Sequence, residues 1–559
     1  MIFQSHAGNR SAQNFSVQGV KLNIIRRATL PLAMLWLAAP AVAEAPLPRL
    51  VSKDGRHALL IDGAPFLLLG GQAHNSSNYP AMLPEVWPTI RAVHANTLEI
   101  PVAWEQIEPA EGKFDFSWLD TLIPQARENN VRLVLLWFGT WKNTSGSYQP
   151  EWVKSDLKRF PHMMTRDGKT HYVPTPLSRH NLEADKRAFV ALMRHIREID
   201  PDHTVIMVQP ENEVGSYGSP RDFSPDANRL FAGPIPVELA RKLGKSGTWS
   251  QVFEAKADSS FNAWYTARYI DEIAAAGQAE LNLPMYVNVV TSDPSDPKAG
   301  EGGGASGGAD WPVLDVWKAA APHIQIAAPD IYDRDYRVVK GKFEKMARPD
   351  NPLFVPELGN DLPFARFFWL ALGKGAIGVS PFGMDPTYSN YPLGGLNTPE
   401  NLEAFASKFA LLAPIARDWA KLAFDHPTVG FAKGDDASDQ SVVLGRWKIN
   451  AQYGAWAFGD PNATWMKGPP NPKKDQLVGG AALIQLAPDE FLLAGSDVRI
   501  SFGELAPNPN GGGYFMTVEE GTFDNGQWVM KRRWNGDQTD YGLNLTKPTL
   551  LKVRFGMSR

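Results

Sequence analysis

Apolar runs and amphipathic stretches alternate along most of this chain. A short apolar run at residues 66–70, bounded by turn residues, predicts a first strand. Leu83, Val86, Ile90 and Val93 then recur at helical spacing and predict a helix after it. The alternation continues, and further strands are predicted at residues 97–102, 131–138, 204–208, 285–290, 324–327, 353–355 and 376–379.

Strands linked by helical stretches are typical of parallel β/α architecture. One of the helices is predicted to start at a cap formed by Ser117 and Asp120. Eight strands with intervening helices indicate an α/β fold, a (β/α)8 TIM barrel. The functional site of such a barrel lies at the carboxyl ends of its strands.

The pattern changes after a helix-like stretch at residues 400–422. Alternating apolar residues predict strands at 441–447 and 513–518, and Asp524-Asn525-Gly526 and Asn535-Gly536 are hairpin-turn signals. These features predict a C-terminal antiparallel β domain of the sandwich type. The predicted organisation is an N-terminal extension with a signal peptide at 1–43, the barrel at 44–424 and the β domain at 425–559.

The amino-terminal segment has the features of a secretory signal. Lys21, Arg26 and Arg27 precede an apolar run at residues 28–42, and Ala41-Val42-Ala43 is a small-residue cleavage pattern. The run is shorter than the about 20 apolar residues that a bilayer-spanning helix needs, and prolines interrupt it. We therefore expect cleavage after Ala43, no stable membrane insertion, and export to the periplasm or beyond.

Composition narrows the possible classes of function. The 559 residues are 43% hydrophobic and 21% charged, which is enough apolar material for a large core. The net charge of -4, from 56 basic and 60 acidic residues, lacks the basic excess that nucleic-acid binding demands. The absence of cysteine excludes disulfides and thiolate metal sites. No histidine pair at helical spacing suggests zinc, so neither a metal nor a cofactor is implied.

Polar clusters follow two of the predicted strands. The fourth strand runs into Gln209-Pro210-Glu211-Asn212-Glu213-Val214-Gly215, and the seventh runs into Val355-Pro356-Glu357. Strands four and seven face each other across a barrel, so each would place a carboxylate at the same end. Two opposed carboxylates are what retaining glycoside hydrolysis requires, one as nucleophile and the other as acid and base.

These segments, with the stretch EQIEPAEGKFDF at residues 105–116, resemble glycoside hydrolase clan A. They are most similar to the β-galactosidases of family 35, in particular bacterial members with a small C-terminal β domain. The resemblance implies that Glu213 is the acid/base, that Glu357 is the nucleophile and that Asn212 donates to the sugar 2-hydroxyl. It also implies retention of anomeric configuration. Glu211 is expected beside the site.

The chain departs from the family 35 pattern at two strand ends. Gln72-Ala73-His74-Asn75 stands where the family has Ile-His-Tyr, so Asn75 takes the aromatic position. Gly139-Thr140-Trp141 stands where the family has Ala-Glu-Trp, which removes a carboxylate that Lys142 or Asn143 would replace. The expected sugar contacts, with packing in the core as the alternative for each aromatic ring, are His74, Asn75, Trp104, Trp137, Trp141, Asn143, Tyr332 and Phe382.

The resemblance implies a retaining exo-β-galactosidase that hydrolyses terminal β-D-galactosyl residues of oligosaccharides or polysaccharides, including xyloglucan side chains. One alternative is another clan A exo-glycosidase, such as a family 42-like β-galactosidase or an α-L-arabinopyranosidase. A second is a carbohydrate-binding protein without activity, against which the presence of both glutamates argues. The expected partner is a β-galactoside saccharide, with no nucleic acid.

Overall fold

The computed structural model describes residues 45–387, 398–454, 471–505 and 513–557. Packing divides the chain into residues 1–44 and a compact unit of residues 45–559. The predicted signal peptide and its cleavage site after Ala43 lie outside the described residues.

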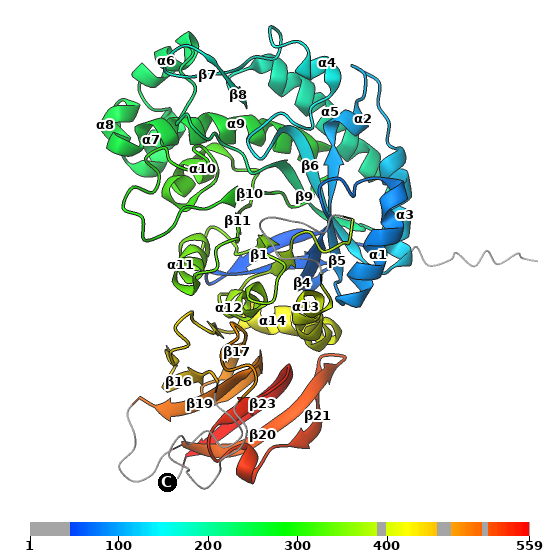
Figure 1. The fold of residues 1–559 in the computed structure, drawn as a ribbon, viewed down its shortest axis with the longest axis vertical. Coiled ribbons are helices and arrows are strands. Elements are labelled where there is room, and N and C mark those ends of the chain that lie inside the picture. The colour runs from blue at the N-terminus through cyan, green and yellow to red at the C-terminus, as the bar shows by residue number, and fades with distance from the viewer. Residues whose placement is uncertain (1–44, 388–397, 455–470, 506–512, 558–559) are drawn as a thin grey trace, which may run out of the picture. The chain divides into compact units, whose positions relative to one another are not determined.

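Within the described residues, eight parallel strands pair in one closed circuit. Figure 1 shows several of them, among them β4, β5, β6 and β9 to β11. Neighbouring strands pair in the order β12, β13, β4, β5, β6 and β9, and β10 pairs with β11. Parallel bridges join Val208 of β9 to Met285 beside β10, and Ile331 beside β11 to Leu358 of β12, which closes the circuit. The strands are β4 (Leu68–Gln72), β5 (Thr97–Ala103), β6 (Arg132–Lys142), β9 (Val205–Asn212), β10 (Tyr286–Val290), β11 (Ile326–Asp330), β12 (Val355–Leu358) and β13 (Gly378–Pro381). Each overlaps a predicted strand, so the parallel α/β architecture is confirmed.

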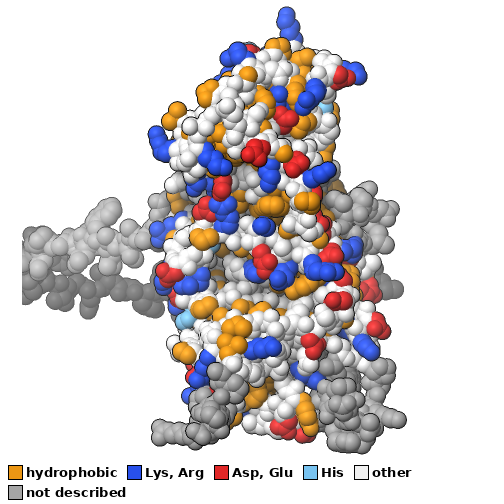
Figure 2. Space-filling view, turned by 90° about the vertical axis from the view of Figure 1, so that its left-hand side faces the viewer, with side chains coloured by type: hydrophobic (Ala, Val, Ile, Leu, Met, Phe, Trp, Pro, Cys, Tyr) orange, Lys and Arg blue, Asp and Glu red, His pale blue; other side chains and the backbone are white. Residues whose placement is uncertain are grey.

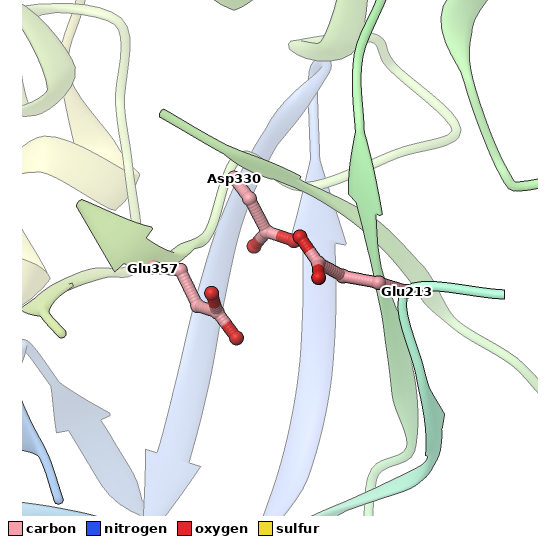
Figure 3. A group of neighbouring side chains, drawn as sticks. All are labelled: Glu213, Asp330 and Glu357. Atoms are coloured by element: carbon pink, nitrogen blue, oxygen red, sulfur yellow. The ribbon is translucent and has the colours of Figure 1, made fainter. Parts of the chain in front are cut away.

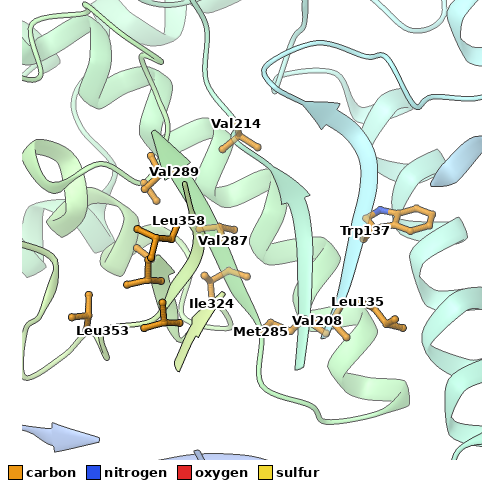
Figure 4. Close-up of a cluster of buried hydrophobic side chains, with 14 of the residues drawn as sticks. Leu135, Trp137, Val208, Val214, Met285, Val287, Val289, Ile324, Leu353 and Leu358 are labelled. Carbon is orange, nitrogen blue, oxygen red and sulfur yellow. The ribbon is translucent and has the colours of Figure 1, made fainter. Parts of the chain in front are cut away.

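Side chains on these strands alternate between two cores. On β6, Val134 and Leu136 belong to a cluster with interior residues of the other strands, whereas Leu133 and Leu135 join the larger core. Figure 4 shows part of that larger core, formed by β6, β9, β10 and their neighbours. Leu59 also belongs to the inner cluster. It comes from a three-stranded antiparallel sheet of β1 (Arg49–Lys53), β2 (Arg56–Ile61) and β3 (Ala64–Phe66), which the sequence pattern did not predict.

Helices connect the parallel strands, and the two longest, α5 and α9, contact each other. The helix predicted at Ser117 begins there, but its cap differs: the Ser117 N–H donates to the Asp115 carboxylate at 2.9 Å, and Asp120 takes no part. The α-helices are α1 (Leu83–Ala92), α2 (Trp104–Ile107), α3 (Ser117–Glu128), α4 (Glu151–Lys154), α5 (Arg179–Ile199), α6 (Pro225–Ala232), α7 (Val237–Leu243), α8 (Trp249–Phe253), α9 (Ala257–Glu280), α10 (Leu314–Ala320), α11 (Tyr336–Met346), α12 (Phe367–Gly373), α13 (Pro399–Leu412) and α14 (Ala416–Asp425). Short 3-10 helices are η1 (Pro80–Met82), η2 (Glu254–Lys256), η3 (Trp311–Val313), η4 (Phe364–Arg366), η5 (Ala413–Ile415) and η6 (Gly536–Gln538).

Antiparallel sheets follow α14, as the sequence predicted. One has the strand order β14-β17-β18-β23-β20-β21, and the other has the order β15-β16-β19-β22. Their side chains share a second apolar core that includes Trp447, Phe491 and Phe555. The strands are β14 (Thr428–Ala432), β15 (Gln440–Leu444), β16 (Trp447–Gln452), β17 (Gly480–Ala487), β18 (Glu490–Ser496), β19 (Val498–Glu504), β20 (Gly513–Asp524), β21 (Gln527–Arg533), β22 (Leu543–Leu545) and β23 (Thr549–Met557). A separate small hairpin, β7 (His162–Met164) and β8 (Thr170–Pro174), lies between β6 and α5.

Turns in this region differ in part from the predictions. The Asn525-Gly526 hairpin is confirmed, since both residues have positive φ angles, 49° and 76°, as a tight turn between paired strands requires. The strand predicted at 441–447 is confirmed over 441–444, within β15, but Gly445, at a φ of 59°, turns the chain before β16 begins at Trp447. Gly536 begins η6 rather than a hairpin turn.

Helix α12 packs directly on β14. A Cβ atom placed on Gly373 would lie 2.0 Å from the Cα of Gly430, so neither glycine has room for a side chain. Nearby, the Trp369 indole N–H donates to Ser496 Oγ at 3.3 Å. The parallel and antiparallel parts of the compact unit are therefore joined by a close backbone contact.

Substitution of Gly373 by alanine is expected to destabilise the whole unit. The added methyl group forces the backbones of α12 and β14 apart, and overpacking of this kind costs about 1 to 3 kcal/mol. The measurement is the midpoint of denaturant unfolding. Gly503→Ala is the matched control because its Cβ would meet only one atom, at 4.0 Å. Equal midpoints for the two variants would contradict the packing argument.

The surface carries charges of both signs. On the face in Figure 2, Lys and Arg side chains lie interspersed with Asp and Glu, and no broad basic area is visible there. Within the described ranges, no helix combines the length and the apolar character needed to span a bilayer.

Candidate active site

Three carboxyl groups meet at the carboxyl ends of the parallel strands (Figure 3). Glu213 directly follows β9, Asp330 ends β11 and Glu357 lies on β12. One side-chain oxygen from each lies within 4.8 Å of the others. The two glutamates predicted from the sequence are therefore brought together, with an aspartate beside them that the sequence analysis did not select as a site residue.

Glu357 is held by four hydrogen-bond donors. Its Oε1 accepts from Gln72 Nε2 at 3.2 Å, Asn212 Nδ2 at 3.4 Å and Asn288 Nδ2 at 3.1 Å. Its Oε2 accepts from the Tyr332 hydroxyl at 2.7 Å. These donors come from the ends of four strands or the loops after them, so they fix the carboxylate in position and suit its ionised, nucleophilic form.

Glu213 has the environment of a general acid. Burial, and next the charge of Glu357, raise the pKa of Glu213 to about 7, while Lys142 acts in the opposite direction. Its backbone N–H donates to Asn288 Oδ1 at 2.9 Å. Asn288 therefore holds the backbone of Glu213 and the side chain of Glu357 at the same time, and so fixes the spacing of the pair.

The backbone that carries Glu213 is in an unusual conformation. Glu211 and Glu213 have φ angles of 67° and 43°, in the left-handed region that residues other than glycine rarely adopt. Asn143 N donates to the carbonyl of Asn212 at 3.2 Å, and Thr144 N donates to the carbonyl of Glu213 at 3.1 Å. The loop after β6 thus clamps this backbone, and Asn143 contributes to the site through its main chain.

Glu211 lies beside the site, as predicted, but binds protein groups. Its carboxyl group accepts from the backbone N–H groups of Trp141 at 2.6 Å and Thr140 at 3.2 Å. Burial, and next the neighbouring Asp185, raise the pKa of Glu211 well above its ordinary value. Glu211 therefore supports the end of β6 through backbone hydrogen bonds.

His74 and Phe382 lie at the ends of β4 and β13. Their rings meet edge to face at 5.7 Å, and the His74 backbone N–H donates to Asp385 at 2.7 Å. Asn75 follows as a half-buried residue. Of the predicted sugar contacts, Asn212 and Tyr332 donate hydrogen bonds to Glu357. His74, Asn75 and Phe382 lie just after the neighbouring strands β4 and β13.

Three tryptophans named as expected sugar contacts pack in the core, which was the alternative given for each of them. Trp137 points to the helix side of β6 (Figure 4), contacts Phe189 and donates its indole N–H to Asp185 at 2.8 Å. Strand periodicity sends every second residue of β6 to that side. The other two indoles are likewise buried and bonded to protein groups, Trp104 to Glu108 at 2.9 Å and Trp141 to the Pro174 carbonyl at 3.1 Å.

A further carboxyl group, that of Glu99 on β5, is buried near Glu357. It accepts hydrogen bonds from the Ser380 hydroxyl and from the Tyr286 hydroxyl, the latter at 3.1 Å. Burial raises the pKa of Glu99 to about 8. Burial thus favours the neutral form of Glu99, which adds no second negative charge next to Glu357.

Gln72, Asn288 and Asp330 are the site residues that sequence reasoning missed. Each lies on the last part of a predicted or extended strand, as Glu357 does, and this position was the available signal. In the described part of the chain, the carboxyl oxygens of Glu213, Asp330 and Glu357 also lie close enough together to hold a cation. Since amide and hydroxyl donors already satisfy Glu357, the arrangement is that of a hydrogen-bonded carboxyl cluster.

Two family models match separate parts of the chain. Residues 84–279 match a glycoside hydrolase family 42 model described as "Beta-galactosidase", and residues 405–546 match a domain of unknown function, DUF5597. The first match contains Asn212 and Glu213 but ends before Asn288, Asp330 and Glu357.

Curated relatives match over shorter stretches. A "Beta-galactosidase" of Xanthomonas manihotis is 26% identical over 218 residues, which are 37% of this chain and 34% of the relative. "Beta-galactosidase 11" of Arabidopsis thaliana is 35% identical over 113 residues, or 19% of this chain and 12% of the relative. The chain thus matches about a third or less of the length of these relatives.

A solved β-galactosidase from the psychrophilic Marinomonas ef1 aligns with a TM-score of 0.48 and 13% identity, and the alignment covers 65% of this chain and 62% of that one. The sequence matches support a glycoside hydrolase enzyme. The family whose model matches is family 42, so the resemblance of the motifs to family 35 is not confirmed.

Proposed function

We propose that this chain is a retaining glycoside hydrolase of the β-galactosidase type, with Glu357 as nucleophile and Glu213 as acid/base. The observation that carries the proposal is the spacing of their carboxyl groups, whose nearest oxygens lie within 4.8 Å. Retaining enzymes hold the two groups about 5 Å apart, whereas inverting enzymes leave about 6.5 Å or more for a water molecule.

In the first step of the proposed reaction, Glu357 bonds to the anomeric carbon while the bond from that carbon to the leaving oxygen breaks. Glu213 gives its proton to this oxygen. In the second step, water attacks the same carbon, Glu213 takes a proton from the water, and Glu357 leaves. A Glu213 pKa of about 7 suits both roles, because the group can release and regain a proton near neutral pH.

The fold supports this assignment at a coarser level. We include in the proposal that the closed circuit of eight strands is a (β/α)8 barrel and that the antiparallel sheets form a C-terminal domain of the sandwich type. The motif around Glu213 favours family 35, while the matched family model favours family 42. The proposal also includes export, with signal-peptide cleavage after Ala43, which amino-terminal sequencing of the mature protein would test.

The proposed substrate is a terminal β-D-galactosyl residue on an oligosaccharide, such as a xyloglucan side chain. Two half-exposed tyrosines, Tyr217 and Tyr172, support a saccharide leaving group. The Tyr172 hydroxyl bonds to Thr144 Oγ1 at 2.7 Å, next to the backbone of Glu213. Partial burial, and next the nearby Glu213, raise the pKa of Tyr217 to about 12. Both rings thus lie on the acid/base side, where a leaving group departs, and aromatic faces stack well on sugars.

The proposed function is tested by hydrolysis of aryl β-galactoside, β-glucoside and α-L-arabinopyranoside side by side, with the anomer first released identified by NMR. Release of β-galactose supports the proposal. Turnover of only the arabinopyranoside would replace the sugar and keep the mechanism. Release of the α-anomer would overturn retention, and sugar binding without turnover would favour a carbohydrate-binding protein.

Tyr217→Ala is expected to raise KM for a galactosylated oligosaccharide about 10-fold, because the leaving sugar loses a stacking surface. For an aryl β-galactoside, kcat is expected to change less than about 2-fold, since the acid and nucleophile are untouched. Steady-state kinetics on both substrates provide the measurement. Tyr514→Ala, an equally exposed tyrosine on β20, is the matched control. Equal effects on both substrates would argue against a leaving-group site at Tyr217.

A further inference from the structure

Asp330 makes an unusual contact for a buried aspartate. Its side chain, on a residue that is 2% exposed, points at the carboxyl group of Glu213 (Figure 3), and one oxygen of each group lies within 4.8 Å of the other. Among the described residues, no donor bonds to the buried Oδ1 of Asp330. Two ionised carboxylates repel at this distance, so a contact of this kind needs a proton between the oxygens. The two-glutamate mechanism assigns one proton to this cluster, on Glu213, and does not say what keeps Asp330 beside it.

The surroundings indicate which group keeps this proton. The other Asp330 contact is a hydrogen bond accepted by Oδ2 from Asn288 Nδ2 at 3.0 Å. Burial, and next the charge of Glu357, raise the pKa of Asp330 well above its ordinary value. The titratable or charged groups that act on Asp330 come from several elements: Glu213 and Tyr217 after β9, Glu357 on β12, Tyr286 on β10 and Lys142 on β6. Tyr332, after β11, bonds to Glu357. Lys142 is the cation of this set, and its Nζ donates a hydrogen bond to Asn143 Oδ1 at 2.5 Å.

We propose that Asp330 is a positioning residue whose protonated carboxyl group donates a hydrogen bond to Glu213 throughout the reaction. This inference rests on the proposed function and deepens it. When Glu213 has given its own proton to the leaving oxygen, its new negative charge receives a charge-assisted hydrogen bond from Asp330. When Glu213 takes a proton from water in the second step, this bond weakens again. The Asp330 proton is not consumed, and no atom of Asp330 bonds to the sugar.

Two variants separate this role from an ionised Asp330. The amide of Asp330→Asn keeps both contacts, since its oxygen accepts from Asn288 and its NH2 donates to Glu213. Asp330→Ala removes the donor. In a plot of kcat/KM against pH, we expect the alkaline limb of Asp330→Asn to have nearly the same pKa as that of the wild type. We expect the limb of Asp330→Ala to move about one pH unit higher, because Glu213 loses a bond that favours its ionised form.

An ionised Asp330 predicts the opposite result. Both variants would then remove a negative charge beside Glu213, and both alkaline limbs would move to lower pH. The leaving group gives a second readout. Asp330→Ala is expected to slow a poor leaving group about 10-fold and an activated dinitrophenyl galactoside less than about 3-fold, since only the former needs the proton. Equal slowing of both substrates would reduce Asp330 to a structural role and overturn the proposal.

An infrared measurement keeps this inference separate from the proposed function. The band of protonated carboxyl groups in the wild type at mildly alkaline pH is expected to lose the share of one group in Asp330→Asn. An unchanged band overturns the proposal even when the wild type hydrolyses β-galactosides. If the wild type hydrolyses no glycoside, the proposed function fails, and the infrared band still decides whether Asp330 carries the proton.

Discussion

Glu357→Gln is expected to lower kcat on an aryl β-galactoside by about 10^4-fold or more, because no other group in the site replaces a lost nucleophile. The fold should tolerate this change. The glutamine oxygen accepts from the amides of Gln72, Asn212 and Asn288, and the Tyr332 hydroxyl turns to accept from the new NH2 group. The loss of rate therefore measures the loss of the nucleophile and not a loss of folded protein.

The measurement for Glu357→Gln is kcat together with the denaturant midpoint of the purified variant. Glu490→Gln on the surface of β18 is the control, and its rate should stay within about 2-fold of the wild type. A Glu357→Gln variant that keeps a tenth of the wild-type rate would assign the nucleophile elsewhere. A fluorinated galactoside that accumulates as an ester should label Glu357 in the wild type and leave the variant unlabelled.

Glu213→Ala is expected to show the second largest loss, and its size should depend on the leaving group. Hydrolysis of an oligosaccharide should fall by about 10^4-fold, the upper range for removal of a general acid. A dinitrophenyl galactoside needs no proton to leave, so its first step should be nearly unaffected, and loss of the base would then let the glycosyl-enzyme accumulate. Added azide attacks this ester without a base and should restore turnover as galactosyl azide.

The pH dependence follows from the same group. Because burial and the charge of Glu357 raise the pKa of Glu213 to about 7, wild-type kcat/KM should fall as the pH rises through that value. In the free enzyme Glu213 must be protonated for the first step, which fixes the sign. Glu213→Ala should lose this alkaline limb on the activated substrate. A limb that persists in the variant would belong to another group.

Much of the parallel sheet could be predicted because buried parallel strands appear as continuous apolar runs. Glu213 and Glu357 were found because the polar clusters that follow two such runs contain them and resemble clan A motifs. Asn288 lies within β10 and Asp330 ends β11, but a polar residue in or at the end of a strand has no distinct pattern until the strands are brought together. The link between Glu213 and Asp330 joins residues more than a hundred positions apart, and only the closed circuit places them in contact.

The tryptophans were harder to place because proximity to a strand end does not determine which side of the strand a side chain occupies. The two-residue period of β6 directs Trp137 toward the helices, where its indole N–H donates a hydrogen bond to Asp185 of α5. The three-stranded sheet before β4 went unpredicted since its strands are short and half polar. The role of Asp115 was missed because the Ser117 and Asp120 pattern resembles a capping box that begins two residues later.

The contact between α12 and β14 limits how the chain can be shortened. Every residue of α12 is buried, and part of that cover comes from β14 and β17. Truncation before β14 would expose Phe368, Trp369 and their neighbours as an apolar patch of the kind that drives aggregation. For protein engineering, the strands from residue 428 onward must therefore be kept, because they cover α12.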